Sequence, residues 1–216
     1  MAKLCAKYRP RKWSDVLGQE VAVSAIRESL RQGWGGRAWS IVGESGTGCT
    51  TIAMLLAEEQ ADEARVSYTA GVLVDTAMVV RMANENPGKE RIVVNRAYVI
   101  DRPSGIPADA LEMLLSVLPC LHKNICVVFT QTFGDERAWL SESVLAQQVS
   151  NLCHRVVLTK DGLEEPFAKR CKEIADQEGL GGKNLPSYKA LARRCGSSIG
   201  AMLNQIEMGE MMKDCP

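Results

Sequence analysis

A glycine-rich segment at residues 43–51, which reads GESGTGCTT, constrains this chain more than any other part of its sequence. It matches the spacing of the phosphate-binding loop G-x-x-x-x-G-K-[ST], in which small residues let backbone N–H groups wrap a phosphate. Residues 38–42 before it read as a buried strand, and residues 50–57 after it have the apolar spacing of a helix. This order predicts the α/β fold of a nucleotide-binding protein.

One residue departs from the loop pattern. Cys49 stands where the pattern has its lysine, so the loop lacks the cation that reaches the outer phosphates. A charge-assisted contact is worth about 1.5–3 kcal/mol, so its loss predicts an affinity for nucleotide lower by roughly ten- to a hundredfold. The candidate nucleotide-binding residues of this segment are Gly43, Gly46, Thr47, Gly48, Cys49, Thr50 and Thr51.

Composition and charge exclude several classes of protein. Lys and Arg number 26, as do Asp and Glu, so net charge steers the chain to neither nucleic acid nor an anionic membrane. No apolar run approaches the roughly 18–20 residues of a membrane span, and the N-terminus lacks a secretory signal. Eight cysteines without a C-x-x-C pair or a histidine cluster argue against a zinc module or a disulfide framework, and favour reduced thiols in the cytoplasm.

Strand and helix patterns alternate from about residue 20 to residue 157, which is typical of a parallel α/β sheet. The sequence predicts helices at 21–30, 72–82 and 107–118, and strands at 65–70, 91–101, 125–130 and 155–158. After residue 158 the strands cease, and three amphipathic stripes begin near Phe167, Tyr188 and Ile199. We therefore expect an α/β domain at residues 1–158 and a helical lid domain at residues 159–216.

Several motifs together resemble the clamp-loader branch of the AAA+ ATPases, the ring motors that open sliding clamps onto DNA. The relatives in question are the gamma and delta-prime subunits of DNA polymerase III and the small subunits of replication factor C. The motifs are, in chain order, KYRP at 7–10, WSDVLGQE at 13–20, the phosphate-binding loop, a strand ending at Asp101, and a strand ending at Thr132. The resemblance covers residues 7 to about 208. It implies a P-loop AAA+ parallel sheet flanked by helices, followed by a small three-helix lid. Members of the family continue into a helical collar, and no collar domain is expected within these 216 residues.

The resemblance also implies roles for individual residues. Tyr8, Arg9 and Pro10 would lie beside the nucleotide base. Asp101 and the hydroxyl of Thr50 would hold Mg²⁺, and Thr132 would be the polar residue called sensor 1.

Four charged positions of the family's catalytic set are replaced in this chain: by Cys49, by Arg102, by Leu152 in Asn-Leu-Cys, and by Ile199, or Gly200 if the register slips by one. Arg102 stands where a glutamate orients the attacking water, and a guanidinium stays protonated and cannot act as a base. We therefore expect no catalytic residues and no hydrolysis. ATP or ADP with Mg²⁺ is the cofactor that the site could take, and the favoured expectation is that none is tightly bound.

The leading hypothesis is a non-hydrolysing clamp-loader-like subunit that acts by protein contacts in DNA replication. Its partners would be a sliding clamp or other clamp-loader subunits, with DNA contacted within an assembly and no membrane. One alternative is a stand-alone regulatory or inhibitory protein that binds a replication component. Another is a weakly active ATP-dependent helicase loader or branch-migration motor. The candidate contact group is Ile106, Met113 and Val117, outside the leucine stripe of 107–118. The favoured interpretation of these residues is nevertheless an ordinary buried helix.

Overall fold

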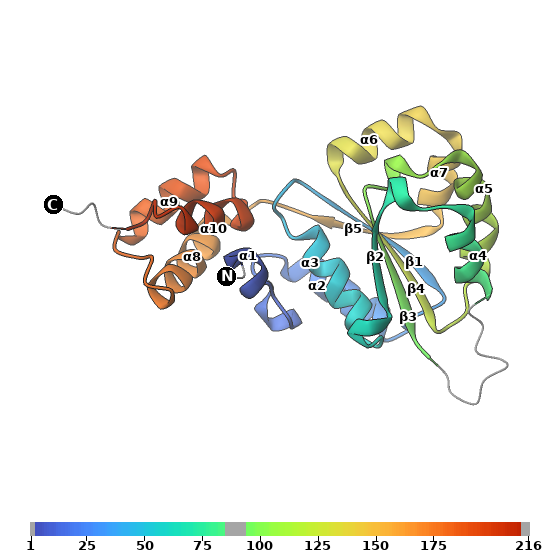
Figure 1. Ribbon diagram of the computed structural model, residues 1–216, viewed down its shortest axis with the longest axis horizontal. Helices are drawn as coiled ribbons and strands as arrows, with labels where there is room; N and C mark the ends of the chain where they lie inside the picture. Colours follow the sequence, from blue (N-terminus) through green and yellow to red (C-terminus); the bar gives the residue numbers. More distant parts are fainter. Residues whose placement is uncertain (1–2, 85–93, 213–216) are drawn as a thin grey trace. The chain divides into compact units, whose positions relative to one another are not determined.

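A computed structural model describes residues 3–84 and 94–212 of the chain. It contains one sheet of five parallel strands in the order β2-β3-β4-β1-β5 (Figure 1). The strands are β1 (Arg37–Gly43), β2 (Val66–Ala70), β3 (Arg96–Asp101), β4 (Ile125–Thr132) and β5 (Cys153–Leu158).

The chain divides into two compact units. The sheet unit comprises Val21–Gly43 and Cys49–Leu158, and the helical unit comprises Met1–Glu20, Glu44–Gly48 and Thr159–Pro216. The short loop segment Glu44–Gly48 thus groups with the C-terminal helices, although the strand before it and the helix after it belong to the sheet unit.

The two central strands, β1 and β4, are buried along almost their whole length. A parallel sheet that is covered on both faces needs continuous apolar strands, and this explains the unbroken apolar runs in the sequence. In the register of the sheet, Gly43 pairs with Thr132 and Asp101 pairs with Thr130. The predicted Mg²⁺ carboxylate and the predicted sensor 1 residue therefore lie at the same carboxyl edge of the sheet.

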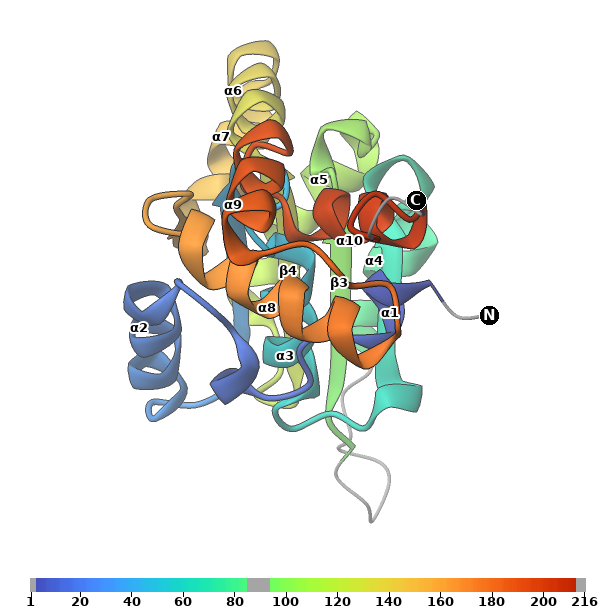
Figure 2. The same ribbon diagram turned by 90° about the vertical axis from the view of Figure 1, so that its left-hand side faces the viewer.

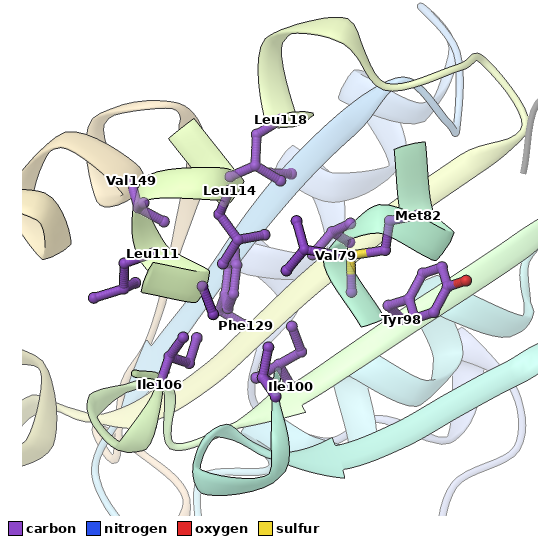
Figure 3. Close-up of a cluster of buried hydrophobic side chains, with 14 of the residues drawn as sticks. Val79, Met82, Tyr98, Ile100, Ile106, Leu111, Leu114, Leu118, Phe129 and Val149 are labelled. Carbon is purple, nitrogen blue, oxygen red and sulfur yellow. The ribbon is translucent and has the colours of Figure 1, made fainter. Parts of the chain in front are cut away.

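Helices cover both faces of the sheet (Figure 1). One face carries α2 (Glu20–Leu30) and α3 (Cys49–Glu58), and the other carries α4 (Thr76–Asn84), α5 (Ala108–Val117), α6 (Phe133–Glu142) and α7 (Val144–Asn151). On the second face, Val79, Leu111, Leu114 and Val149 pack against Ile100 and Phe129 of the sheet (Figure 3). The described residues of this unit also form short 3₁₀ turns at η2 (Glu63–Arg65), η3 (Gly71–Leu73), η5 (Pro103–Gly105) and η6 (Leu118–Cys120).

The alternative that Ile106 belongs to an exposed contact group is wrong, and the favoured interpretation, that this residue is buried, is confirmed. Its side chain is only 6% exposed and lies in the core with Leu111 and Phe129 (Figure 3). Met113 and Val117 are half-buried against the same core. Other apolar side chains of this unit are exposed: Val72 and Leu73 of η3, and Val21, Tyr68, Val80, Val144, Leu152 and Val157.

Four further elements differ from the sequence expectation. The helix predicted at 72–82 begins only at Thr76, because Asp75 accepts a hydrogen bond from the backbone N–H of Met78 at 2.7 Å and caps it. The strand predicted at 91–101 begins at Arg96, and residues 91–93 lie outside the described residues. Two helices, α6 and α7, precede the last strand without having been predicted.

The helical unit has its own apolar core. It contains α1 (Leu4–Lys7), η1 (Trp13–Asp15), α8 (Glu164–Gln177), α9 (Leu185–Arg194) and α10 (Ile199–Glu207). Figures 1 and 2 show α8, α9 and α10 gathered with α1. The core is formed by buried side chains that include Leu4, Phe167, Ile174, Tyr188, Leu191, Met202 and Ile206. In the described part of the chain, no strand of the sheet follows residue 158.

Candidate nucleotide site

The residues predicted for the nucleotide site fall on both units. Asp101, Thr132 and the start of α3 belong to the sheet unit. Tyr8 to Pro10 and the loop segment Glu44–Gly48 belong to the helical unit.

Asp101 ends β3 with both oxygens of its carboxylate engaged. Thr130, its register partner on β4, donates a hydrogen bond from Oγ1 to Oδ1 of Asp101 at 2.8 Å. Arg102 places its Nε 3.6 Å from Oδ2 of the same carboxylate. If the Asp101 carboxylate bound a metal ion, it would have to give up its ion pair with Arg102.

Arg102 adopts a backbone conformation that residues other than glycine rarely take, with φ 51 and ψ 70. For an L-residue the left-handed region costs roughly 1–2 kcal/mol. The backbone N–H of Arg102 donates to the carbonyl of Thr130 at 2.8 Å, and its own carbonyl lies against Gly71. A Cβ at Gly71 would come within 2.3 Å of that oxygen, so only glycine fits there. The side chain of Arg102 is 69% exposed.

Cys49 occupies the first position of α3 and is half-buried. Its Sγ donates a hydrogen bond to the carbonyl oxygen of Gln131 at 3.9 Å. A thiol that donates to a carbonyl is neutral, and it brings no positive charge to a phosphate group. Thr50 and Thr51 follow in the first turn of the helix, and both are half-buried.

Thr132 serves as the N-terminal cap of α6. Its Oγ1 accepts a hydrogen bond from the backbone N–H of Asp135 at 3.2 Å and donates one to Oδ2 of Asp135 at 2.8 Å. Threonine at this position satisfies one of the free amides at a helix start. The hydroxyl predicted to act as sensor 1 is therefore bound to its own helix.

The loop segment closes on itself by a tight turn. Thr47 donates from its Oγ1 to the carbonyl of Glu44 at 2.8 Å and from its backbone N–H to the same oxygen at 3.2 Å. Gly46 and Gly48 have φ values of 88 and 101, which glycine adopts readily and other residues do not. The glycines of the motif therefore provide the positive φ angles that the backbone of this loop adopts.

The opening segment contacts the lid helix α8. Tyr8 donates from its hydroxyl to the carboxylate of Glu178, and Lys7 Nζ lies 2.6 Å from Oε1 of the same residue. The hydrogen bond from Lys7 lowers the pKa of Glu178, and the hydrogen bond to Glu178 raises the pKa of Tyr8. Arg9 is exposed and Pro10 is half-buried. A position beside a nucleotide base stays a prediction for these residues.

Two residues of this region carry contacts that sequence reasoning missed. Thr130 binds Asp101, and Gln19 donates from Nε2 to the carbonyl of Thr159 at 2.7 Å. Thr130 lies two residues before Thr132 in a buried strand, so both side chains are on the same face of the sheet. This spacing was the sequence signal that could have pointed to Thr130. Gln19 has no comparable signal, since its partner lies far away in the sequence.

Metal and membrane sites receive no support from the described residues. Within residues 3–84 and 94–212 there is no group of three or more His, Cys, Asp or Glu side chains placed to hold a metal ion. None of the helices in these ranges has both the length and the apolar character needed to cross a bilayer.

Comparison with known proteins gives two short sequence matches. No family model matches the chain. The gamma subunit of DNA polymerase III from Buchnera aphidicola subsp. Baizongia pistaciae (strain Bp) is 49% identical over 55 residues. The gamma subunit from Buchnera aphidicola subsp. Acyrthosiphon pisum (strain APS) is 44% identical over 55 residues. Each match covers 26% of this chain and only 15% of the relative.

Solved structures extend the likeness to nearly the whole chain. Two point mutants of Thermotoga maritima RuvB match with TM-scores of 0.66 and 0.67, at 16% and 18% identity, over 93% of this chain. The fold is that of RuvB. This confirms the predicted fold class, an α/β fold with a parallel sheet flanked by helices and followed by further helices. The chain spans 64% and 65% of the two RuvB chains, and identities this low carry fold alone.

The residues present do not fit a tightly bound nucleotide with Mg²⁺, which the spacing of the phosphate-binding loop implies. The loop has a neutral thiol at Cys49 in place of a cation. The carboxylate of Asp101 is shared between Thr130 and Arg102. A permanent positive charge beside the carboxylate that was predicted to hold Mg²⁺ opposes the binding of a divalent cation there.

Proposed function

We propose that this chain is a non-hydrolysing, clamp-loader-like AAA+ protein that acts by protein contacts in DNA replication in the cytoplasm. Its proposed partners are a sliding clamp or clamp-loader subunits, with DNA contacted within such an assembly. The support is the 55-residue likeness to two DNA polymerase III gamma subunits, together with a fold that covers nearly the whole chain. We propose an α/β domain at residues 1–158 and a lid at residues 159–216.

The proposed loss of hydrolysis is supported above all by the pair formed by Asp101 and Arg102. The strand that ends at Asp101 is followed directly by a guanidinium whose Nε lies 3.6 Å from the carboxylate. A residue that orients and deprotonates an attacking water must accept a proton, and arginine does not. The neutral Cys49 removes a second charge from the phosphate-binding loop.

An exposed apolar surface offers a place for a partner to bind. Val72 is 69% exposed and Leu73 is 70% exposed, both in η3, and Val80 of α4 is 41% exposed. We call these three residues the η3 surface. Exposed apolar groups of this kind are candidate anchors for protein contacts.

The η3 surface is held on a rigid base. A Cβ at Gly71 would meet the carbonyl oxygen of Arg102 at 2.3 Å, and a Cβ at Gly105 would meet the backbone nitrogen of Val72 at 2.8 Å. The two turns η3 and η5 therefore pack backbone to backbone. This fixes the direction in which Val72 and Leu73 are presented, so little order has to be gained when a partner binds.

The test combines binding with turnover. Purified protein is mixed with a sliding clamp or with clamp-loader subunits, and the complexes are sized by chromatography with light scattering. We expect a complex that Leu73→Asp abolishes. Val144→Asp, at a residue 68% exposed at the start of α7, is the matched control and should leave the complex intact. Thermal unfolding should change little in either variant, because both side chains are exposed.

Two results would contradict the proposal. The first is ATP turnover at or above about 1 s⁻¹, near the low end of ordinary enzymes, that Asp101→Asn abolishes. The second is the absence of any complex with these replication proteins when the folded protein is tested. Binding that survives Leu73→Asp would leave the function standing and place the contact on another surface.

A further inference from the structure

The middle of the phosphate-binding loop belongs by its contacts to the helical unit, which also contains the lid helices. We propose that this loop serves as the docking point of the chain's own lid, which it holds without nucleotide. The contacts involve Gln19, Glu44, Gly46, Lys160 and Ser198, which we call the loop–lid clasp. The inference rests on the proposal that the loop no longer serves hydrolysis, and its test is separate from a test of turnover.

The closest contact of the clasp joins Gly46 to Ser198. A Cβ built on Gly46 would lie 2.3 Å from both Cβ and Oγ of Ser198, and 2.7 Å from its Cα. Ser198 is the N-terminal cap of α10, because its Oγ accepts a hydrogen bond from the backbone N–H of Ala201. The start of a lid helix is thus pressed onto the loop, where no residue larger than glycine fits.

The second contact is a buried amide bridge. Gln19 is only 3% exposed, and its Nε2 donates to the carbonyl of Thr159 at 2.7 Å and to the carbonyl of Thr47 at 3.4 Å. Its Oε1 accepts from the backbone N–H of Thr159 at 3.3 Å. One side chain therefore ties the loop to the first residue of the lid. Breaking the bridge leaves buried polar groups without partners, which is costly.

The third contact is an ion pair between Glu44 and Lys160. Oε2 of Glu44 lies 3.0 Å from Nζ of Lys160, with the side chains 55% and 26% exposed. Nζ of Lys160 is also 3.7 Å from the position of a Cβ at Gly196, in the turn that leads to α10. A pair this exposed adds only about 0–1 kcal/mol. The pair joins the loop to the first residues of the lid and to the turn before α10.

These contacts give the loop a structural role that needs no ligand. A nucleotide can shift the position of a lid only by its difference in affinity for the two positions. Here glycine packing, an amide bridge and an ion pair already join the loop to the lid. Lid docking should therefore be independent of nucleotide, and the glycine frame is retained because Ser198 needs the space at Gly46.

The experiment compares alanine at two glycines of the same loop by hydrogen–deuterium exchange. Gly46 and Gly48 have φ values of 88 and 101, so Gly46→Ala and Gly48→Ala introduce the same kind of backbone strain. Only position 46 meets a neighbour, since nothing lies within 4 Å of a Cβ at Gly48. We expect Gly46→Ala to raise exchange in the backbone of 198–204 by at least about fivefold, and Gly48→Ala to leave it near wild type. If the two variants change exchange in the backbone of 198–204 equally, the loop–lid clasp is overturned.

Charge reversal provides a second measurement if Gly46→Ala does not fold. Glu44→Lys and Lys160→Glu should each raise exchange at 44–48 and 159–163, and the double variant should restore protection. Lys172→Glu, which breaks the ion pair of Lys172 with Asp176 on α8, is the matched control and should not affect those segments. Single variants that exchange like wild type overturn the clasp.

Nucleotide dependence is tested on the wild-type protein with MgATP as the probe. We expect MgATP to leave exchange in the lid unchanged. If MgATP is needed for protection of 198–204, the clasp is overturned. Turnover of ATP, measured in the same samples, bears on the proposed loss of hydrolysis alone and not on the clasp.

Discussion

The guanidinium of Arg102 lies beside the carboxylate of Asp101, with Nε of the one 3.6 Å from Oδ2 of the other. The pair is held by a left-handed backbone at Arg102 and by the hydrogen bond from Thr130 to the opposite carboxylate oxygen. Strained residues of this kind persist only where their surroundings fix them. In this chain the surroundings are the carbonyl of Thr130 and the close backbone of Gly71.

Replacing Arg102 by glycine should stabilise the protein. Arg102→Gly removes the cost of the left-handed conformation, roughly 1–2 kcal/mol. The greater freedom of glycine in the unfolded chain offsets about 0.5–1 kcal/mol of that gain. We expect a net rise of about 0.5–1 kcal/mol in the free energy of unfolding, measured by urea denaturation. Arg81→Gly, in the middle of α4, is the control and should lose about 0.8–1 kcal/mol. If Arg102→Gly lowers the free energy of unfolding as much as Arg81→Gly does, the argument from backbone strain is contradicted.

Gly71→Ala should destabilise the protein, because the new methyl group meets a carbonyl oxygen at 2.3 Å that belongs to backbone and cannot swing away. Forced crowding of this kind costs about 1–3 kcal/mol. Gly134→Ala in α6 is the control. There a Cβ would meet only Thr132 Oγ1 at 3.8 Å, and alanine in a helix gains about 0.5–1 kcal/mol over glycine. The measurement is the melting temperature of each variant. A fall for Gly71→Ala together with a rise for Gly134→Ala supports the packing of η3 on η5, whereas changes in the same direction argue against it.

The strands were predictable from the sequence because parallel strands covered on both faces show as unbroken apolar runs. The run at 125–130 is an example, and the structure extends it to Thr132. The helix α6 was missed because only two of its ten side chains, Glu136 and Trp139, are buried. Its start is marked instead by the cap at Thr132, which the motif assignment had already used as sensor 1.

Contacts between distant segments could not be predicted. Ile106 lies before the first turn of α5, where helical periodicity does not apply, and its burial depends on Leu111 and Phe129 packing around it. Likewise, a glycine at position 46 is what any phosphate-binding loop requires. Gly46 also makes room for Ser198, and this contact can be seen only in the folded structure.

Acid should release the N-terminal helix α1 from the lid. The hydrogen bond from Lys7 holds the pKa of Glu178 below its ordinary value of 4.5. A carboxyl whose pKa is lower in the folded state stabilises that state at pH values above 4.5, and this contribution is lost as the pH falls through the folded-state pKa. Protection of the amides of α1 should therefore decline below about pH 4.5 in the wild type.

Glu178→Gln should remove most of this pH dependence, because the amide no longer titrates. Its protection at pH 7 should already resemble that of the acidified wild type. Glu112→Gln, at an exposed residue on α5, is the control and should retain the wild-type profile. An unchanged profile in Glu178→Gln assigns the acid response to other carboxylates.

Cys49→Lys should raise the affinity of the protein for MgATP without producing turnover. The substitution returns a cation to the loop, and one charge-assisted contact is worth about 1.5–3 kcal/mol, or roughly a ten- to hundredfold gain in affinity. Turnover should stay absent, because Arg102 still occupies the position where a base is needed. Isothermal titration measures the affinity and a phosphate-release assay measures the turnover.

The control for this variant is Cys120→Lys, which adds the same charge at an exposed cysteine in η6, away from the loop. A similar gain in both variants would assign the effect to net charge rather than to the loop. No gain in Cys49→Lys would mean that the backbone amides of the loop do not open to a phosphate even when a cation is present. In that case, combining Cys49→Lys with Gly46→Ala tests whether releasing Ser198 from the loop allows binding.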